Sequence, residues 1–220
     1  MTKFRAAGAS LSAASLLAAA TLVTGATAAQ ADTQTARTWA GAATLAGEDG
    51  SLWKPTYRAG ESRVGQPIEV TTDTFPGEGE PQPAMTVTAN YGDDQRGFTI
   101  TQKFADYEWA AEPAFDRSIA PVGTADVTID NGDPDTPITL SAQISANCYL
   151  PKNSDNPPPP PEDFTCSKSD VKRFGGVLEM TVEPPSTMTA PGTTTVIIES
   201  QGISYAKLLR IASGLQQVMG

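Results

Sequence analysis

Histidine is absent from all 220 residues of this chain. Its absence removes the side chain that most often acts as a general base near neutral pH, and also the commonest metal ligand. Ser-His-Asp and Cys-His hydrolase sites are therefore excluded, as are zinc sites that contain histidine. The chain also lacks a P-loop and a dinucleotide-binding glycine fingerprint. We expect no catalytic residues, no cofactor and no metal.

A hydrophobic run long enough to span a membrane is also missing. Residues 11–23 are only weakly apolar and are shorter than the roughly 20 residues that a membrane span needs. Lys3 and Arg5 precede this run, and Ala29-Gln30-Ala31 follows it. Such a pattern is typical of a secretory signal peptide. We predict cleavage between Ala31 and Asp32, which removes residues 1–31 and leaves residues 32–220 as one secreted domain without a membrane anchor.

Basic residues are scarce after the predicted cleavage site. The predicted mature chain has 13 basic and 25 acidic residues, a formal net charge of −12. A field of this sign repels nucleic acids and anionic membranes, so we expect neither as a partner. A strongly acidic surface is also an ordinary means of staying soluble.

Cysteine occurs only twice, at Cys148 and Cys166. In an exported chain an even pair predicts a disulfide, which would stabilise this fold by roughly 3 kcal/mol. Two free thiols or a redox pair are the alternative, although the close C-x-x-C spacing of redox pairs is absent. Within the predicted loop, Pro157 to Pro161 favour polyproline II structure. This run is either a tolerated loop or a stiff edge presented to a partner.

The alternation of apolar and polar residues predicts two β-hairpins, each with turn-forming residues between its strands. One apolar and one polar face are expected of an antiparallel sheet that is covered on one side. Weaker strand patterns occur at residues 68–72, 177–182 and 194–199, residues 76–81 form a loop, and residues 32–37 are expected to fray. The predicted hairpins pair residues 85–91 with 98–104, and residues 125–129 with 138–144.

The period of the pattern changes at the C-terminus. From Ser204 onward, apolar residues recur at the 3/4 spacing of one helix face, and Ser204 is a suitable N-cap. We expect this helix to lie across the apolar side of the sheet. The predicted fold class is α+β, mainly β, with a curved antiparallel sheet or sandwich covered by a C-terminal amphipathic helix. The apolar stripe consists of Leu208, Ile211, Ala212, Leu215 and Val218 or Met219.

Several short motifs have a chemical and a structural interpretation. Ser204-x-x-Lys207 and Ser154-Asp155-Asn156 are typical of penicillin-binding acyl-transferases, but their order is reversed and no K-T-G triad exists. A helix cap and a turn explain them better. The aspartates at 130, 133 and 135 could suggest calcium, yet the twelfth position of such a loop is Ser141 instead of Glu. A turn is favoured there, as at Asp93-Asp94.

Carboxylates could support polysaccharide hydrolysis without histidine. Glu108 and Glu112 are candidates, although no spacing distinguishes a pair. The stretch Leu52 to Tyr57 could expose aromatic rings to sugars, but the large rings of a small β-rich domain usually fill its core. That core prediction applies to Trp39, Trp53 and Trp109.

Residues 194–215 form a strand pattern that leads through Gly202-Ile203-Ser204 into Ala206-Lys207-Leu208-Leu209-Arg210-Ile211-Ala212. This segment resembles the end of uncharacterised exported or membrane-tethered bacterial domains. Residues 91–104 and 123–130 are also similar to the central strands of those domains. The resemblance implies a curved antiparallel sheet with helical cover at the cell envelope, and it assigns no site residue.

Together these features favour a secreted, non-catalytic domain that binds a protein or a cell-envelope component. One alternative is a carboxylate-dependent enzyme acting on polysaccharide, with two acidic side chains about 5–10 Å apart in a cleft beside aromatic residues. Another is a protease inhibitor that uses the loop from Cys148 to Cys166 as bait. The sequence identifies neither the partner nor the oligomeric state.

Overall fold

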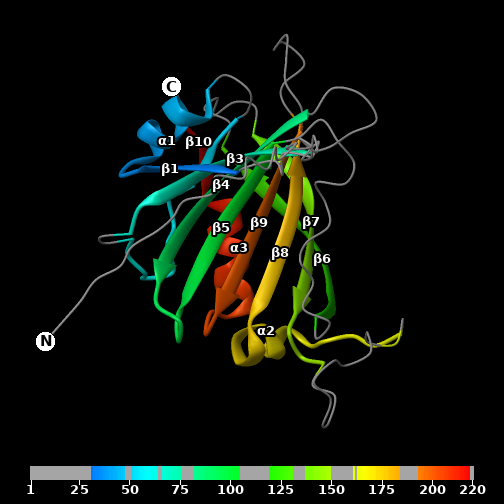
Figure 1. Ribbon diagram of the computed structural model, residues 1–220. Coiled ribbons are helices and arrows are strands. Elements are labelled where there is room, and N and C mark those ends of the chain that lie inside the picture. The colour runs from blue at the N-terminus through cyan, green and yellow to red at the C-terminus, as the bar shows by residue number, and fades with distance from the viewer. Residues whose placement is uncertain are drawn as a thin grey trace, which may run out of the picture.

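The fold is built on one eight-stranded sheet in which every neighbouring pair is antiparallel (Figure 1). The computed structural model describes residues 31–47, 51–63, 66–75, 82–104, 119–130, 137–149, 161, 163–183 and 193–218. Along the sheet the strand order is β1-β3-β4-β5-β9-β8-β7-β6. The strands are β1 (Asp32–Ala36), β3 (Ile68–Phe75), β4 (Gln82–Gly92), β5 (Gly97–Phe104), β6 (Ala120–Ile129), β7 (Ile138–Ala146), β8 (Gly176–Val182) and β9 (Thr194–Gln201).

Two short strands and three helices complete the described part of the chain. The strands β2 (Trp53–Pro55) and β10 (Leu215–Gln217) pair with each other as a second small sheet. The helices are α1 (Trp39–Ala46), α2 (Lys168–Phe174) and α3 (Tyr205–Ser213). The predicted class, α+β and mainly β with a C-terminal helix on an antiparallel sheet, is confirmed.

Both predicted hairpins form, as β4–β5 and β6–β7. In the first, Tyr91 pairs with Phe98, and Gly92 pairs with Gly97. The turn between them depends on Asp93, whose Oδ1 accepts hydrogen bonds of 2.9 Å from the backbone N–H groups of Gln95 and Arg96. Such local capping is why Asp favours turns. The tip of the second hairpin, residues 131–136, lies outside the described residues.

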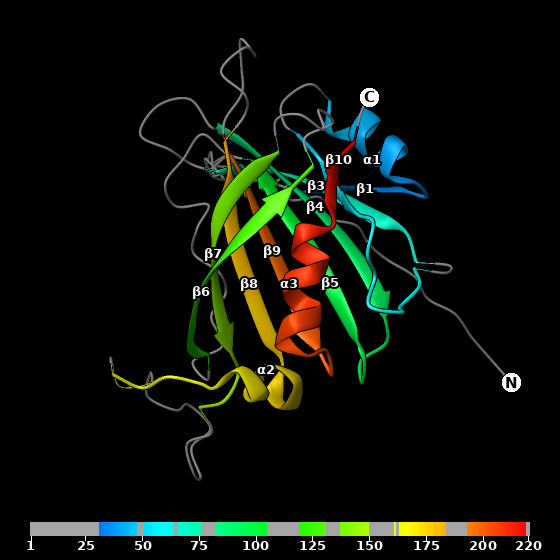
Figure 2. The same cartoon turned by 180° about the vertical axis from the view of Figure 1, so that it is seen from behind.

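The sheet has an inner face that carries the core and an outer face that is mostly polar. On β5, Phe98, Ile100 and Phe104 are buried on the inner face, while Thr99 and Thr101 alternate with them on the outer face. Helix α3 crosses the inner face, and Leu208 and Ile211 are fully buried beneath it (Figure 2). This placement of the terminal helix confirms the sequence-based prediction.

The predicted extent of the C-terminal helix is wrong. Helix α3 ends at Ser213, and Leu215 belongs to β10, where it pairs with Pro55 of β2. Leu215 is still fully buried, so this position is apolar because it packs in the core from a strand and not from a helix. Ser204 occupies the N-cap position, but its backbone carbonyl, not its side chain, accepts the N–H of Leu208 at 2.9 Å.

One polar side chain on the inner face is fully buried and joins the two sheets. Gln102 of β5 accepts a hydrogen bond from the Trp53 backbone N–H and donates one to the Trp53 carbonyl, both at 2.7 Å. The side-chain amide thereby makes the two hydrogen bonds that the backbone of a neighbouring strand would otherwise make to Trp53 of β2. A buried amide is tolerated because both of its polar atoms are hydrogen-bonded.

The expectation that residues 32–37 fray is also wrong. Residues Asp32–Ala36 form β1, which pairs along its whole length with β3 at the edge of the sheet. Four of its five residues are exposed, and only Ala36 reaches the core. An exposed edge strand can be polar throughout, which removes the period-2 signal that would have identified it.

Candidate functional site

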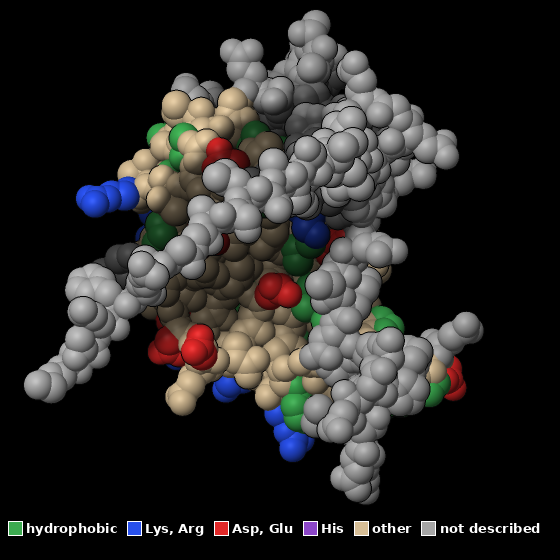
Figure 3. Space-filling view, in the orientation of Figure 1, with side chains coloured by type: hydrophobic (Ala, Val, Ile, Leu, Met, Phe, Trp, Pro, Cys, Tyr) green, Lys and Arg blue, Asp and Glu red, His purple; other side chains and the backbone are tan. Residues whose placement is uncertain are grey.

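A groove with a volume of about 640 Å³ lies across one end of the outer face. It lies where β3 and β5 begin and β4 and β9 end. We call it the strand-end groove, and Figure 3 shows acidic side chains gathered at this end of the molecule. Its lining residues are Gln66, Pro67, Glu69, Asn90, Tyr91, Gly92, Asp93, Asp94, Gly97, Phe98, Thr99, Glu199, Ser200 and Gln201.

Hydrogen-bonded and stacked side chains hold the groove in shape. The rings of Tyr91 and Phe98 stack with centroids 4.6 Å apart, and Trp39 Nε1 donates to the Tyr91 hydroxyl at 2.9 Å. On the outer face, the Thr99 hydroxyl donates to Asn90 Oδ1 at 2.7 Å. Because Tyr91 and Phe98 are buried, a ligand would meet the polar rim before any aromatic surface.

The charge of the strand-end groove is entirely of one sign. Four carboxylate side chains line it and no Lys or Arg does. The two backbone hydrogen bonds to Asp93 lower the pKa of its carboxyl, with the bond from Arg96 having the larger effect. Asp93 is thus held ionised at neutral pH, and the stabilisation from its hydrogen bonds is lost only as pH falls through this lowered pKa. The four carboxylates are Glu69, Asp93, Asp94 and Glu199.

The strand register separates the two glutamates of the groove. Glu69 is on β3 and Glu199 on β9, with β4 and β5 between them. Three steps of roughly 4.8 Å place these strands about 14 Å apart. That separation exceeds the roughly 5–10 Å at which two carboxyl groups cooperate in glycoside hydrolysis. Glu69 and Glu199 are therefore suited to contact different parts of an extended ligand.

A nearer acidic neighbour of Glu199 lies outside the groove. Glu199 pairs with Val177 across β8 and β9, so Glu179, two residues further along β8, is its diagonal neighbour. Diagonal neighbours in a sheet lie about 7–8 Å apart. Glu179 is half-buried, and burial raises the pKa of its carboxyl, an effect that Lys103 partly offsets. The outer face therefore holds a half-buried carboxyl with a raised pKa beside an exposed one.

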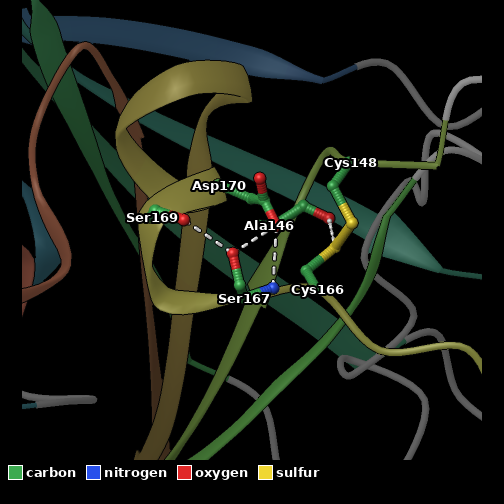
Figure 4. Close-up of a disulfide and its surroundings, with 6 residues drawn as sticks. All are labelled: Ala146, Cys148, Cys166, Ser167, Ser169 and Asp170. Carbon is green, nitrogen blue, oxygen red and sulfur yellow. Dashed lines mark hydrogen bonds between the residues drawn. A yellow bond between two sulfur atoms is a disulfide. The ribbon is translucent and has the colours of Figure 1, made fainter.

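The predicted disulfide between Cys148 and Cys166 is present, with a Cα–Cα distance of 6.0 Å (Figure 4). It links the segment after β7 to the residues that begin α2. The Cys166 sulfur lies 3.2 Å from the Ala146 carbonyl oxygen, and the Cys166 N–H donates to the Pro121 carbonyl at 2.8 Å. An intramolecular disulfide is compatible with an extracellular or otherwise oxidising location.

The disulfide is followed directly by a capped helix. The backbone N–H and the hydroxyl of Ser167 both donate to Asp170 Oδ2, at 2.8 and 2.6 Å (Figure 4). These bonds, the hydroxyl one first, lower the pKa of the Asp170 carboxyl. An ionised Asp in the first turn also suits the helix dipole. Helix α2 thus connects the end of the disulfide loop, Cys166, to β8, which begins at Gly176.

Of the two interpretations of residues 52–57, the structure supports core packing of Leu52 and Trp53 over an exposed aromatic platform. Leu52 and Trp53 are buried in the core, as Trp39 is, because β2 packs beneath the sheet and bonds to Gln102. Trp39 and Trp53 therefore confirm the core interpretation. Among the described residues, no group of three or more His, Cys, Asp or Glu could hold a metal ion. Asp130, one of the three turn aspartates, instead joins β6 to β10 through its backbone.

Several predicted residues lie outside the described residues and keep only their sequence-based interpretation. They are Glu108, Glu112, Trp109, Asp133, Asp135, Ser154 to Asn156 and Pro157 to Pro160. The predicted processing site sits directly before β1, at Ala31 and Asp32, and its cleavage stays a prediction. No described helix is long and apolar enough to cross a membrane.

The groove residues Glu69 and Glu199 and the neighbouring Glu179 were missed by sequence reasoning. Each occupies the polar face of a predicted strand, where a charged residue is ordinary. Glu69 and Glu199 line one groove because β5 lies next to β9, and Glu179 is near Glu199 because β8 pairs with β9; both facts follow from the sheet order and not from spacing along the chain. They could have been identified as candidates from one signal: an acidic residue near the end of a segment in which apolar and polar residues alternate.

The fold and site together define a mainly β protein with a polar, acidic groove at the end of a single antiparallel sheet. Comparison with known proteins finds no family model, no curated protein and no solved structure that matches this chain. The function must therefore be argued from the described residues.

Proposed function

We propose that this protein is a secreted binding domain whose strand-end groove takes up a positively charged, extended segment of a protein partner. The observation that carries the proposal is the presence of four carboxylates and no basic side chain among the groove residues. Opposite charges speed encounter and select against wrong partners. The separation of Glu69 from Glu199 by three strand steps suits a ligand that runs across the strands.

The test is calorimetric titration of the protein with a short oligolysine peptide. The variant Glu69→Gln with Glu199→Gln removes two groove charges without changing side-chain size. Binding should weaken by about twofold to thirtyfold, because each of the two exposed ion pairs contributes roughly 0.2–1 kcal/mol. Raising the salt concentration should weaken binding of the unaltered protein in the same direction.

The matched control removes two exposed charges elsewhere, Asp126→Asn on β6 with Glu183→Gln after β8. Its net charge equals that of the groove variant, so a purely long-range effect would weaken both equally. Equal weakening would contradict the groove as the binding site. Undiminished binding by the groove variant would do so as well.

The carboxylate-dependent polysaccharide enzyme is a second candidate, and the Glu179–Glu199 neighbourhood favours it. A half-buried acid with a raised pKa beside an exposed one is the division of roles that hydrolysis with inversion needs, at separations of roughly 6.5–9.5 Å. Glu179 would protonate the leaving oxygen and Glu199 would activate water. Turnover of an envelope polysaccharide that is abolished by Glu179→Gln, and also by Glu199→Gln, would support it; absence of turnover would remove it.

A further inference from the structure

Helix α2 presents three exposed basic side chains on one side. Lys168 and Lys172 are four residues apart, which places them on the same helix face, and Arg173 is adjacent. Val171, on the opposite side, is fully buried in the core. We call Lys168, Lys172 and Arg173 the α2 cationic face. In Figure 3, basic side chains lie at the bottom of the view, where Figure 1 places α2.

Among the described residues, the α2 cationic face forms no ion pair. The ion pair that the described part of the chain does contain joins Arg96 to Glu61, neither of which belongs to α2. Lys168 Nζ lies 4.8 Å from the ring centre of Tyr205, and the Arg173 guanidinium lies 4.7 Å from that of Phe174. These rings orient the two cations without removing their charge. The one carboxylate of the helix, Asp170, accepts hydrogen bonds from Ser167 and also attracts Arg173 electrostatically, but it forms no ion pair within 4 Å in the described part of the chain.

For an anion in contact with α2, the nearby basic side chains matter more than the negative net charge of the whole chain. The predicted mature chain has a formal net charge of −12, which repels anions at long range. At physiological ionic strength, however, exposed charges are largely screened beyond about 8 Å. An anion that touches α2 therefore experiences chiefly the three basic side chains of that face.

From this arrangement we propose that the α2 cationic face binds a linear phosphodiester polymer of the cell envelope. Arg173 offers a planar fork that matches phosphate oxygens, and the two lysines add charge one helical turn apart. This surface is separate from the strand-end groove, so the proposal does not depend on the proposed groove ligand. It would retain the secreted domain at the wall while the groove stays free.

The neighbourhood of α2 favours a polymer over a lipid bilayer. Gly176, two residues after α2, pairs with Ser200 of the groove lining. A flat anionic membrane laid on α2 would therefore approach the groove carboxylates, whereas a single polymer strand need not. Among the described residues the one exposed large hydrophobic side chain is Leu45, on α1. The helix thus has charge for a polymer but no apolar anchor for a membrane.

The test is binding of the full mature chain to poly(glycerol phosphate) at physiological salt. Lys172→Gln with Arg173→Gln should weaken binding by roughly 25-fold, since each basic residue near an anionic surface contributes roughly fivefold. Dependence on salt should also become less steep. The matched control, Arg37→Gln with Lys54→Gln, removes the same charge away from α2 and should retain binding.

A second variant separates binding from helix stability. Lys172 and Arg173 lie in the last turn, where cations stabilise a helix, but Lys168 lies in the first turn, where they do not. Lys168→Gln should therefore weaken binding by roughly fivefold, while any loss of stability is limited to its contact with the Tyr205 ring, which thermal unfolding measures separately. Equal loss in the control would overturn the proposal, as would unchanged binding by both α2 variants. Tighter binding to vesicles of anionic lipid than to the polymer would overturn it too.

Discussion

The two faces of the sheet use the same strands for different purposes. On β8, Leu178 and Met180 are buried under α3, whereas Glu179 is half-buried and Thr181 is exposed on the other face. The inner face gains its stability from apolar area removed from water. The outer face carries hydroxyls and carboxylates, including those of the strand-end groove. Stability and recognition are thereby assigned to alternate residues, so substitutions should separate them cleanly.

The largest expected effect comes from the inner face. Leu178→Ala should lower the free energy of unfolding by about 2–5 kcal/mol, because it leaves a cavity in a fully buried site. Thr181→Ala, on the exposed face of the same strand, should change it by less than about 0.5 kcal/mol. Urea unfolding measures both. Similar losses in the two variants would break the distinction between the faces.

The disulfide should contribute the next largest effect. Replacing both Cys148 and Cys166 by Ala should cost roughly 3 kcal/mol, because the unfolded chain regains the freedom of the closed loop. Reduction of the unaltered protein is the matched control and should give the same loss in guanidinium unfolding. If the double Ala variant had the same free energy of unfolding as the oxidised protein, the disulfide would not stabilise the fold, and this prediction would be wrong.

Gln102 tests whether a polar residue can belong to the inner face. Gln102→Leu keeps the volume but deprives the Trp53 backbone N–H and carbonyl of their partners. Each buried group left unpaired costs about 1–3 kcal/mol, so the variant should lose at least that much stability. Thr101→Val, its neighbour on the outer face, is the control. If Gln102→Leu proved stabilising, the proposed joining of β2 to the sheet would be wrong.

The smallest effect concerns Glu179 and appears only as a dependence on pH. Burial raises its pKa, so the folded protein holds this proton more tightly than the unfolded chain does. Its contribution to stability is complete below the ordinary value of about 4.5 and is lost as pH rises through the raised pKa. Glu179→Gln should therefore be more stable than the unaltered protein at pH 7.

That advantage of Glu179→Gln should shrink as the pH is lowered toward the ordinary glutamate value. Thermal unfolding at a series of pH values measures it. Glu183→Gln, an exposed change at the end of the same strand, is the matched control. An advantage that is constant with pH would mean that the substitution acts through packing and not through the charge of Glu179.

Local patterns predicted the hairpins but not the contacts between distant segments. The alternation at 85–104 includes its own turn chemistry, so β4 and β5 could be located from the sequence. Leu215 was assigned to a helix because its strand partner, Pro55, lies far away along the chain. Helices α1 and α2 have eight and seven residues, too few to establish a helical period. Short elements are stabilised by tertiary packing, which spacing does not reveal.

The candidate site was beyond prediction for the same reason. The carboxylates of the strand-end groove come from two strands, β3 and β9, and from the turn between β4 and β5, and they share one groove only because β9 returns to lie beside β5. Sequence analysis instead weighted clusters that are close along the chain, such as Asp130 and its neighbours. The disulfide was predictable because the chain has only two cysteines, which allow a single intramolecular pairing.

The claim that the strand-end groove is the binding surface is tested most directly by NMR titration of the isotopically labelled domain with oligolysine. The account predicts shifts of backbone amides at Asn90, Thr99 and Gln201, with little change on β6 or on α2. Shifts that are equally large around Asp126 and Glu183 would show that the peptide follows negative charge wherever it lies, and would contradict a defined site.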